Sequence, residues 1–233
     1  MIRTEDGGDV RTVTLDRPER RNALTLSALA DLERAVVGTD SPVVYLTGAD
    51  GAFSAGADFD AVGEAAAGGL EAIAAFVERG QRTMRAIETA ESVVVAGVDG
   101  PARGGGVELA LACDIRVATP RATFAETGVS IGLFGAWGGT IRLPEVVGTG
   151  DALDLSLSGR TVDAGTALRM GLVQRVTEDP RSVAEEVATN DPDSLRVLKE
   201  LVRADDDRED GEAREREAFV ELLAARAGDF SGQ

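Results

Sequence analysis

The chain has 233 residues, of which 43% are hydrophobic, enough for one domain with a substantial buried core. It carries 41 acidic and 24 basic residues, and its formal net charge of -17 disfavours nucleic acid and anionic membrane surfaces as partners. There is no histidine and only one cysteine, which excludes a serine–histidine triad, a histidine-ligated metal site and an intrachain disulfide.

The charge pattern also bears on where the protein works. Arginine replaces lysine almost everywhere, since Lys199 is the only lysine, and dense carboxylates with few lysines are typical of proteins from salt-loving organisms. Molar salt reduces the Debye length to about 3 Å and screens the self-repulsion of such a surface. We therefore expect a halophilic protein, with an acidic protein from a GC-rich genome as the alternative. The charged N-terminus and the lack of a long apolar run predict a soluble, cytoplasmic protein.

Strands and helices alternate along the chain. Residues 9–15 alternate like a half-buried strand, and a helix capped by Thr25 or Ser27 is expected to run to about Val37. Two β-branched runs, 42–47 and 92–98, indicate buried strands, and shorter extended segments are expected at 114–118 and 122–125. Together they predict an α/β fold. Further helices are expected at 60–90, 106–112, 138–147, 150–157, 163–169, 181–190, 193–204 and 212–227.

Two glycine-rich turns, 52–58 and 100–108, are the most informative segments. Each follows one of the two buried strands and leads into a helical pattern. Such a turn leaves backbone N–H groups without intrahelical partners where a ligand can approach closely. Two of them can direct two N–H groups at one developing negative oxygen, as an oxyanion hole requires. The alternative is that these glycines only allow close packing of helix against strand.

An ordered set of motifs gives the chain a family resemblance. The set covers residues 10 to 203, and its sequence and spacing resemble the enoyl-CoA hydratase/isomerase (crotonase) superfamily. The matching residues are Arg17-Pro18, Asn22-Ala23-Leu24, Ser54-Ala55-Gly56-Ala57-Asp58, Gly104-Gly105-Gly106-Val107-Glu108-Leu109-Ala110, Cys113-Asp114, Gly138-Gly139-Thr140, Arg142-Leu143, Ser158-Gly159-Arg160, Ala164, Ala167 and Gly171-Leu172-Val173.

The resemblance implies a crotonase-like spiral of ββα units with a C-terminal helical region. We expect the spiral core in residues 1–190, and in residues 191–233 a helical segment that is shortened relative to the family and packs in the oligomer. The family usually assembles as trimers or dimers of trimers and binds acyl-CoA thioesters. Coenzyme A would then be part of the substrate, with no separate cofactor.

The resemblance also assigns the catalytic residues. In the family two backbone N–H groups hold the thioester carbonyl oxygen, and these match Ala57 and Gly105. Glu108 matches one of the two hydratase glutamates and is the candidate acid/base. Its alternative role is a first-turn acid that the helix dipole favours, worth about 0.3–1 kcal/mol.

The position of the second hydratase glutamate is occupied by Gly128. Glu126, two residues earlier, could replace it through a loop shift. Because two glutamates share the work of adding water, this departure leaves other reactions open. The alternatives are an enoyl-CoA isomerase or an acyl-CoA decarboxylase that passes through the same enolate, and a weakly catalytic CoA-binding subunit.

The substrate-binding residues are expected in two loops and a helix start. The family's nucleotide-side loop is matched by Arg21, Asn22, Ala23 and Leu24. The segment that lies over the pantetheine in the family is matched by Ala55 to Asp58, and Gly104 is expected to bind substrate as well. Asp60 stands where a lysine often meets a phosphate, so Arg20 or Arg21 is expected to compensate. Trp137 is expected to line or plug the acyl pocket, or else to pack against a neighbouring helix.

Overall fold

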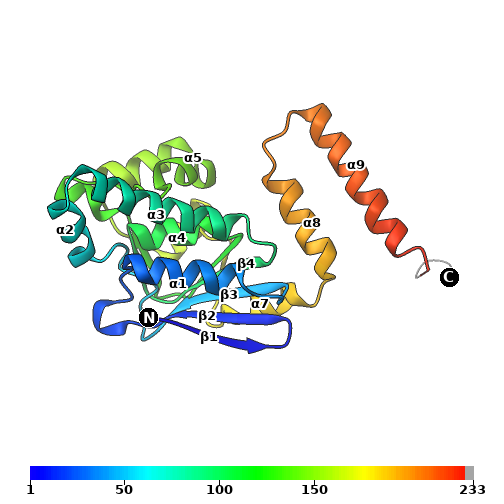
Figure 1. The fold of residues 1–233 in the computed structure, drawn as a ribbon, viewed down its shortest axis with the longest axis horizontal. Coiled ribbons are helices and arrows are strands. Elements are labelled where there is room, and N and C mark those ends of the chain that lie inside the picture. The colour runs from blue at the N-terminus through cyan, green and yellow to red at the C-terminus, as the bar shows by residue number, and fades with distance from the viewer. Residues whose placement is uncertain (229–233) are drawn as a thin grey trace.

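The computed structural model describes residues 1–228, in which a large and a small β-sheet are surrounded by helices (Figure 1). The large sheet has the strand order β1-β2-β3-β4-β6-β9. Only the β1–β2 hairpin is antiparallel, and the other neighbours are parallel. The strands are β1 (Ile2–Gly7), β2 (Val10–Leu15), β3 (Val43–Gly48), β4 (Val93–Val98), β6 (Ile115–Ala118) and β9 (Arg175–Val176).

Both faces of the central strands are covered, which explains their unbroken apolar runs. In β3 and β4, Val44 and Val94 belong to the main core, whereas Val43 and Val93 belong to a smaller cluster on the opposite face. Helices α1 (Leu26–Val37), α3 (Leu70–Glu88) and α4 (Gly105–Ala112) contribute to the main core, and α7 (Arg181–Ala188) to the smaller cluster. The expected α/β class is confirmed.

The small sheet connects the second glycine turn to the segment that follows β6. It consists of β5 (Pro101–Arg103), β7 (Thr123–Ala125) and β8 (Val162–Asp163), with β7 in the middle. Strand β7 continues into a 3-10 helix, η2 (Thr127–Ile131), and β8 into helix α6 (Ala164–Arg169). The Gly104 N–H donates to the carbonyl of Ala125 at 3.0 Å, so Glu126, between β7 and η2, lies close to the start of α4.

The helix predicted over 60–90 is wrong as a single element. It is two helices, α2 (Phe59–Ala67) and α3, because the chain turns at Gly68 and Gly69 and the φ of Gly69 is +84°. The two helices predicted over 138–147 and 150–157 form α5 (Gly139–Ser158), which is kinked at Gly148, where φ is +77°. Residues 9–15 are also more deeply buried than a half-buried strand, since five of the six residues of β2 are buried.

The C-terminal helices project away from the sheets. Figure 1 shows α8 (Pro192–Arg203) and α9 (Arg208–Ala225) beside the main body, with α9 turning back from the end of α8. Lys199 and Arg203 of α8 form ion pairs with Asp114, and Arg203 also pairs with Glu88. The predicted boundary at residue 190 lies just before α8, and residues 229–233 of the predicted C-terminal segment lie outside the described residues. Within residues 1–228, no helix is both long and apolar enough to cross a membrane.

Candidate active site

The two glycine turns meet beyond the carboxyl ends of β3 and β4. The N–H groups of Phe53 and Ser54 both donate to the carbonyl of Pro101, at 3.0 and 3.2 Å. Arg103 N–H donates in return to the Ser54 carbonyl at 2.9 Å. The parallel order of β3 and β4 therefore fixes the two turns against one another.

The backbone N–H groups of Ala57 and Gly105 lie close together at this junction. A Cβ atom placed on Gly105 would lie only 3.2 Å from the Ala57 nitrogen. Among the hydrogen bonds of residues 1–228, neither the Ala57 nor the Gly105 N–H donates to a protein acceptor. The approach requires glycine at position 56, where φ is +84° and a Cβ would lie 2.5 Å from the Arg103 carbonyl oxygen. The two N–H groups expected from the sequence therefore lie close together, and neither has a protein acceptor within residues 1–228.

Glu108 lies in the first turn of α4 with 2% of its surface exposed. Its Oε1 accepts hydrogen bonds from the backbone N–H groups of Trp137, at 2.7 Å, and Gly139, at 2.8 Å. Burial raises the pKa of this carboxyl, while the two N–H donors oppose the shift. The carboxylate is thus held by a separate loop, which the helix-dipole alternative does not require.

The loop that holds Glu108 owes its shape to Gly135 and Gly139, of which only Gly139 belongs to a motif identified in the sequence, and there without a role toward Glu108. A Cβ on Gly135 would lie 2.9 Å from the Glu108 carboxyl carbon, and one on Gly139 would lie 3.0 Å from Oε1. Alanine at either position would displace the carboxylate. The signal in the sequence was the glycine-rich run 135–139, whose function becomes clear only when α4 is seen beneath it.

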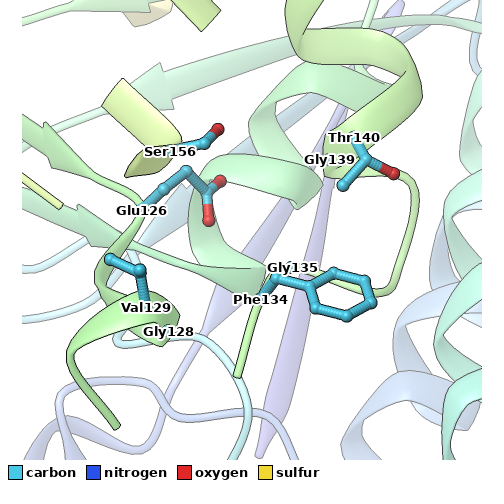
Figure 2. Close-up of a pocket in the computed structure, with 8 residues that line it drawn as sticks. All are labelled: Glu126, Gly128, Val129, Phe134, Gly135, Gly139, Thr140 and Ser156. Carbon is cyan, nitrogen blue, oxygen red and sulfur yellow. The ribbon is translucent and has the colours of Figure 1, made fainter. Parts of the chain in front are cut away.

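The structure places Glu126 in a small cavity beside the site. Figure 2 shows its carboxyl group extending into a space between Ser156 and the loop of Gly135 and Gly139. Glu126 is 7% exposed, and its Oε1 has no hydrogen-bond partner among residues 1–228. Burial, and then the charge of Glu108, raise the pKa of Glu126 to about 8. The two carboxyl groups are therefore close enough to interact.

Gly128, at the position of the second family glutamate, lies in the wall of the same cavity. A Cβ there would lie 3.1 Å from the carbonyl oxygen of Leu133 and from the Cα of Phe134. The backbone of residues 133–134 thus crosses where a side chain at 128 would begin. A glycine at position 128 therefore leaves room for the backbone of residues 133–134, and Glu126 supplies the carboxyl group in the same cavity.

The raised pKa of Glu126 predicts that the protein loses stability as the pH rises. The folded state keeps the proton up to about pH 8, whereas an unfolded glutamate releases it near pH 4.5. Between these values the folded state binds more protons, so the free energy of unfolding falls with pH by up to about 1.4 kcal/mol per unit. In urea titrations from pH 5 to 8 we expect the Glu126→Gln variant to have a shallower pH dependence. An unchanged slope would contradict the burial of Glu126.

Trp137 is buried and packs against a neighbouring helix, which is one of the two alternatives expected of it. Its indole packs on Gly80 of α3 and forms a tilted pair with Phe76, with ring centroids 5.6 Å apart. The other edge of the ring lies over Gly105, where an added Cβ would come within 2.5 Å of Cζ3. Trp137 is therefore part of the core and also borders the proposed oxyanion site.

The loop residues expected to bind substrate fall into two groups. Asn22, Leu24 and Asp58 are buried. The side chain of Asn22 accepts from Arg17 N–H and donates to the carbonyls of Ala49 and Ala52. Asp58 pairs with Arg17, and its carboxylate caps α2. These side chains hold the loop in place, whereas Arg21, Ala23, Ala55 and Gly104 are exposed or half-buried beside the two turns.

Three arginines, Arg20, Arg21 and Arg103, border this loop. Arg20 forms an exposed ion pair with Asp60 at 3.1 Å, so Asp60 is partly neutralised by a neighbour. Arg103 is half-buried and donates to the carbonyl and hydroxyl of Thr123. Burial, and then the charge of the nearby Arg21, lower the pKa of Arg103. Arg21 and Arg103 therefore form a positive edge on a strongly acidic protein, and sequence reasoning had not included Arg103.

Comparison with known proteins agrees with this geometry. The enoyl-CoA hydratase/isomerase family model matches residues 5–225. The chain is 35% identical over 211 residues to the short-chain-enoyl-CoA hydratase of Clostridium acetobutylicum, covering 85% of this chain and 79% of that protein. It is 39% identical over 178 residues to the crotonyl-CoA hydratase of Syntrophomonas wolfei, covering 74% and 67% of the two chains.

Solved structures show the same fold. The enoyl-CoA hydratase of Bacillus anthracis superposes with a TM-score of 0.87 and 31% identity, covering 96% of this chain and 91% of the other. The enoyl-CoA hydratase of Thermoplasma volcanium superposes with a TM-score of 0.88 and 31% identity, covering 96% of this chain and 92% of the other. The expected crotonase-like fold is confirmed. This chain belongs to the enoyl-CoA hydratase/isomerase, or crotonase, family of enzymes.

Proposed function

We propose that the protein acts on acyl-CoA thioesters by stabilising a thioester enolate, with the N–H groups of Ala57 and Gly105 as the oxyanion hole and Glu108 as an acid/base. The observation that carries this proposal is that the N–H groups of Ala57 and Gly105 lie close together without a described protein acceptor, beside the first turn of α4, which also bears the buried Glu108. A thioester carbonyl bound there would have its C2 and C3 atoms beside a carboxyl group.

The chemistry needs both parts of the site. Removing a proton from C2, or adding a nucleophile at C3, places negative charge on the thioester oxygen. Two preorganised N–H donors stabilise that charge, and losing one such donor typically costs about 3–4 kcal/mol. A carboxyl group that moves a proton to or from carbon contributes a further factor of about 10²–10⁴.

Features around the site fit the rest of an acyl-CoA. Arg21 and Arg103 give a positive edge for the CoA phosphates, and Leu24 of the loop before α1 forms a backbone bridge with Ala57 of the first glycine turn. On the cavity side, Phe134 and Val129 are 71% and 40% exposed and offer apolar contact to an acyl chain. The high acidity of the remaining surface supports work at high salt, where the CoA phosphates are less strongly repelled.

A homo-oligomer, a trimer or a dimer of trimers, is part of the proposal. Helices α8 and α9 project from the body and expose apolar side chains that a monomer would leave in water (Figure 1). The exposed apolar residues of these helices are Leu198, Val202, Phe219, Val220 and Leu223. Sedimentation in molar KCl tests this part without affecting the catalytic proposal.

Trp137 gives a direct test of thioester binding. It is the only tryptophan in the chain, and its indole lies over Gly105. We expect butyryl-CoA to change the tryptophan emission in a saturable titration in molar KCl, and the Trp137→Phe variant to give no signal. Free coenzyme A, which has no thioester oxygen, should produce a smaller change. Equal responses to the two ligands, or no response, would contradict binding of the thioester at this site.

A further inference from the structure

A second carboxyl group faces the site from a position where the family pattern does not place it. We propose that Glu126 is a second acid–base group which, together with Glu108, makes the natural reaction the addition of water to a 2-enoyl thioester. The inference rests on the proposed function, because it assumes that the thioester oxygen is bound at Ala57 and Gly105. It selects hydration from the reactions that one enolate site could support.

The carboxyl groups of Glu108 and Glu126 lie on either side of the same loop. Gly135 and Gly139 line the cavity that Glu126 enters, and both also lie against the Glu108 carboxylate. Glu126 comes to the cavity from β7 and Glu108 from α4, so two independent elements deliver them. In Figure 2 the Glu126 side chain extends toward this loop and away from Val129.

The cavity suits a water molecule. Its volume is about 30 Å³, whereas a single water needs roughly 10–15 Å³ measured in this way. A buried water also needs two to four polar partners. Here the unpartnered Oε1 of Glu126 and the side chains of Ser156 and Thr140 line the space. A buried carboxyl oxygen without a partner is costly unless it is neutral or hydrated.

Hydration requires one carboxyl group that accepts a proton and one that donates a proton. The surroundings of Glu108 and Glu126 differ in this way. Glu108 receives two backbone N–H donors, which favour its ionised form, whereas no described hydrogen bond reaches the Glu126 carboxyl. In the proposed pair Glu108, whose Oε1 is held by two N–H donors, is therefore the proton acceptor, and Glu126, which no described donor reaches, is the proton donor. Such a pair can take one proton and give another within a single turnover.

The reaction then balances as follows. Ionised Glu108 accepts a proton from water while the water oxygen bonds to C3 of the enoyl thioester. The C2=C3 electron pair moves toward C2 and the thioester oxygen, where the two N–H groups stabilise the negative charge. Neutral Glu126 gives its proton to C2, and a 3-hydroxyacyl thioester results. Glu108 is left protonated and Glu126 ionised, and a proton returns from one to the other between turnovers.

The experiment compares crotonyl-CoA hydration by wild type and Glu126→Gln across pH 6 to 10 in molar KCl. We expect kcat for the variant to fall about 10²–10⁴-fold, with KM changed less than threefold. We also expect the wild-type rate to fall above about pH 8, where Glu126 ionises, and the variant to lack this decline. Glu91→Gln, at an exposed glutamate before β4, serves as the matched control and should behave like wild type.

Each contrary outcome has a distinct meaning. Hydration by Glu126→Gln within threefold of wild type, with the same decline above pH 8, would overturn the assignment of Glu126. A wild type that binds butyryl-CoA but does not hydrate crotonyl-CoA would overturn the inference and leave the proposed function intact. A wild type that binds no thioester would overturn the proposed function itself. The wild-type pH profile needs no variant, so the inference stays testable even if Glu126→Gln folds poorly.

Discussion

Replacing Glu108 with glutamine is expected to reduce acyl-CoA turnover by about 10²–10⁴-fold while leaving the fold intact. The glutamine oxygen can still accept the N–H groups of Trp137 and Gly139, so the loop over α4 keeps its anchor. What disappears is the group that ionises. Rates of crotonyl-CoA hydration and of 3-butenoyl-CoA isomerisation, measured side by side in molar KCl, check this prediction.

The matched control for Glu108→Gln is again Glu91→Gln, which removes one carboxylate from an exposed position. The two variants should have the same circular dichroism spectrum, and their urea midpoints should differ by no more than the loss of one carboxylate explains. If Glu108→Gln kept wild-type rates for both reactions, Glu108 would be a structural residue and the helix-dipole alternative would be correct.

The Gly105→Ala variant is expected to lose most of its turnover, because the substitution disturbs the proposed oxyanion hole. The added Cβ would lie 2.5 Å from the Trp137 indole and 3.2 Å from the Ala57 nitrogen. The ring or the turn must therefore move, and a misplaced donor of this kind typically lowers kcat by about 10²–10³-fold. The overpacking should also cost about 1–3 kcal/mol of stability. Turnover, urea denaturation and Trp137 emission measure the three consequences.

Gly63→Ala provides the glycine control, because a Cβ at Gly63 in α2 would meet no atom within 4 Å. Alanine also suits a helix interior, so this variant should be as active and as stable as wild type or slightly more stable. Gly105→Ala with normal turnover would contradict the placement of the thioester oxygen between Ala57 and Gly105.

The sequence predicted the framework of the site because that framework depends on local signals. Strand, glycine turn and helix recur twice, and the parallel order of β3 and β4 then brings Ala57 and Gly105 together. Residues 60–90 were harder, since an apolar period of 3.6 continues across Gly68 and Gly69 although the chain turns there. Strand β1 was missed because its charged residues are exposed at a sheet edge and show no apolar alternation.

The second carboxyl shows what sequence spacing cannot decide. Counting from Glu108 identifies Gly128 as a departure from the family pattern, and it leaves Glu126 as an open alternative. Only the three-dimensional path of residues 133–134, which crosses over Gly128, shows that Glu126 occupies the cavity. For Trp137 the structure shows the packing against α3 and Gly105, and its expected role in the acyl pocket stays a prediction. The division at residue 190 and the halophilic character stay predictions.

Exchange of the C2 protons of butyryl-CoA in D₂O, followed by NMR in molar KCl, tests the central claim most directly. Enolate formation at the thioester is common to hydration and isomerisation, so the measurement does not depend on which reaction is natural. We predict exchange catalysed by wild type and reduced at least 10²-fold in Gly105→Ala. Saturable binding of butyryl-CoA without catalysed exchange would contradict an enolate-stabilising site.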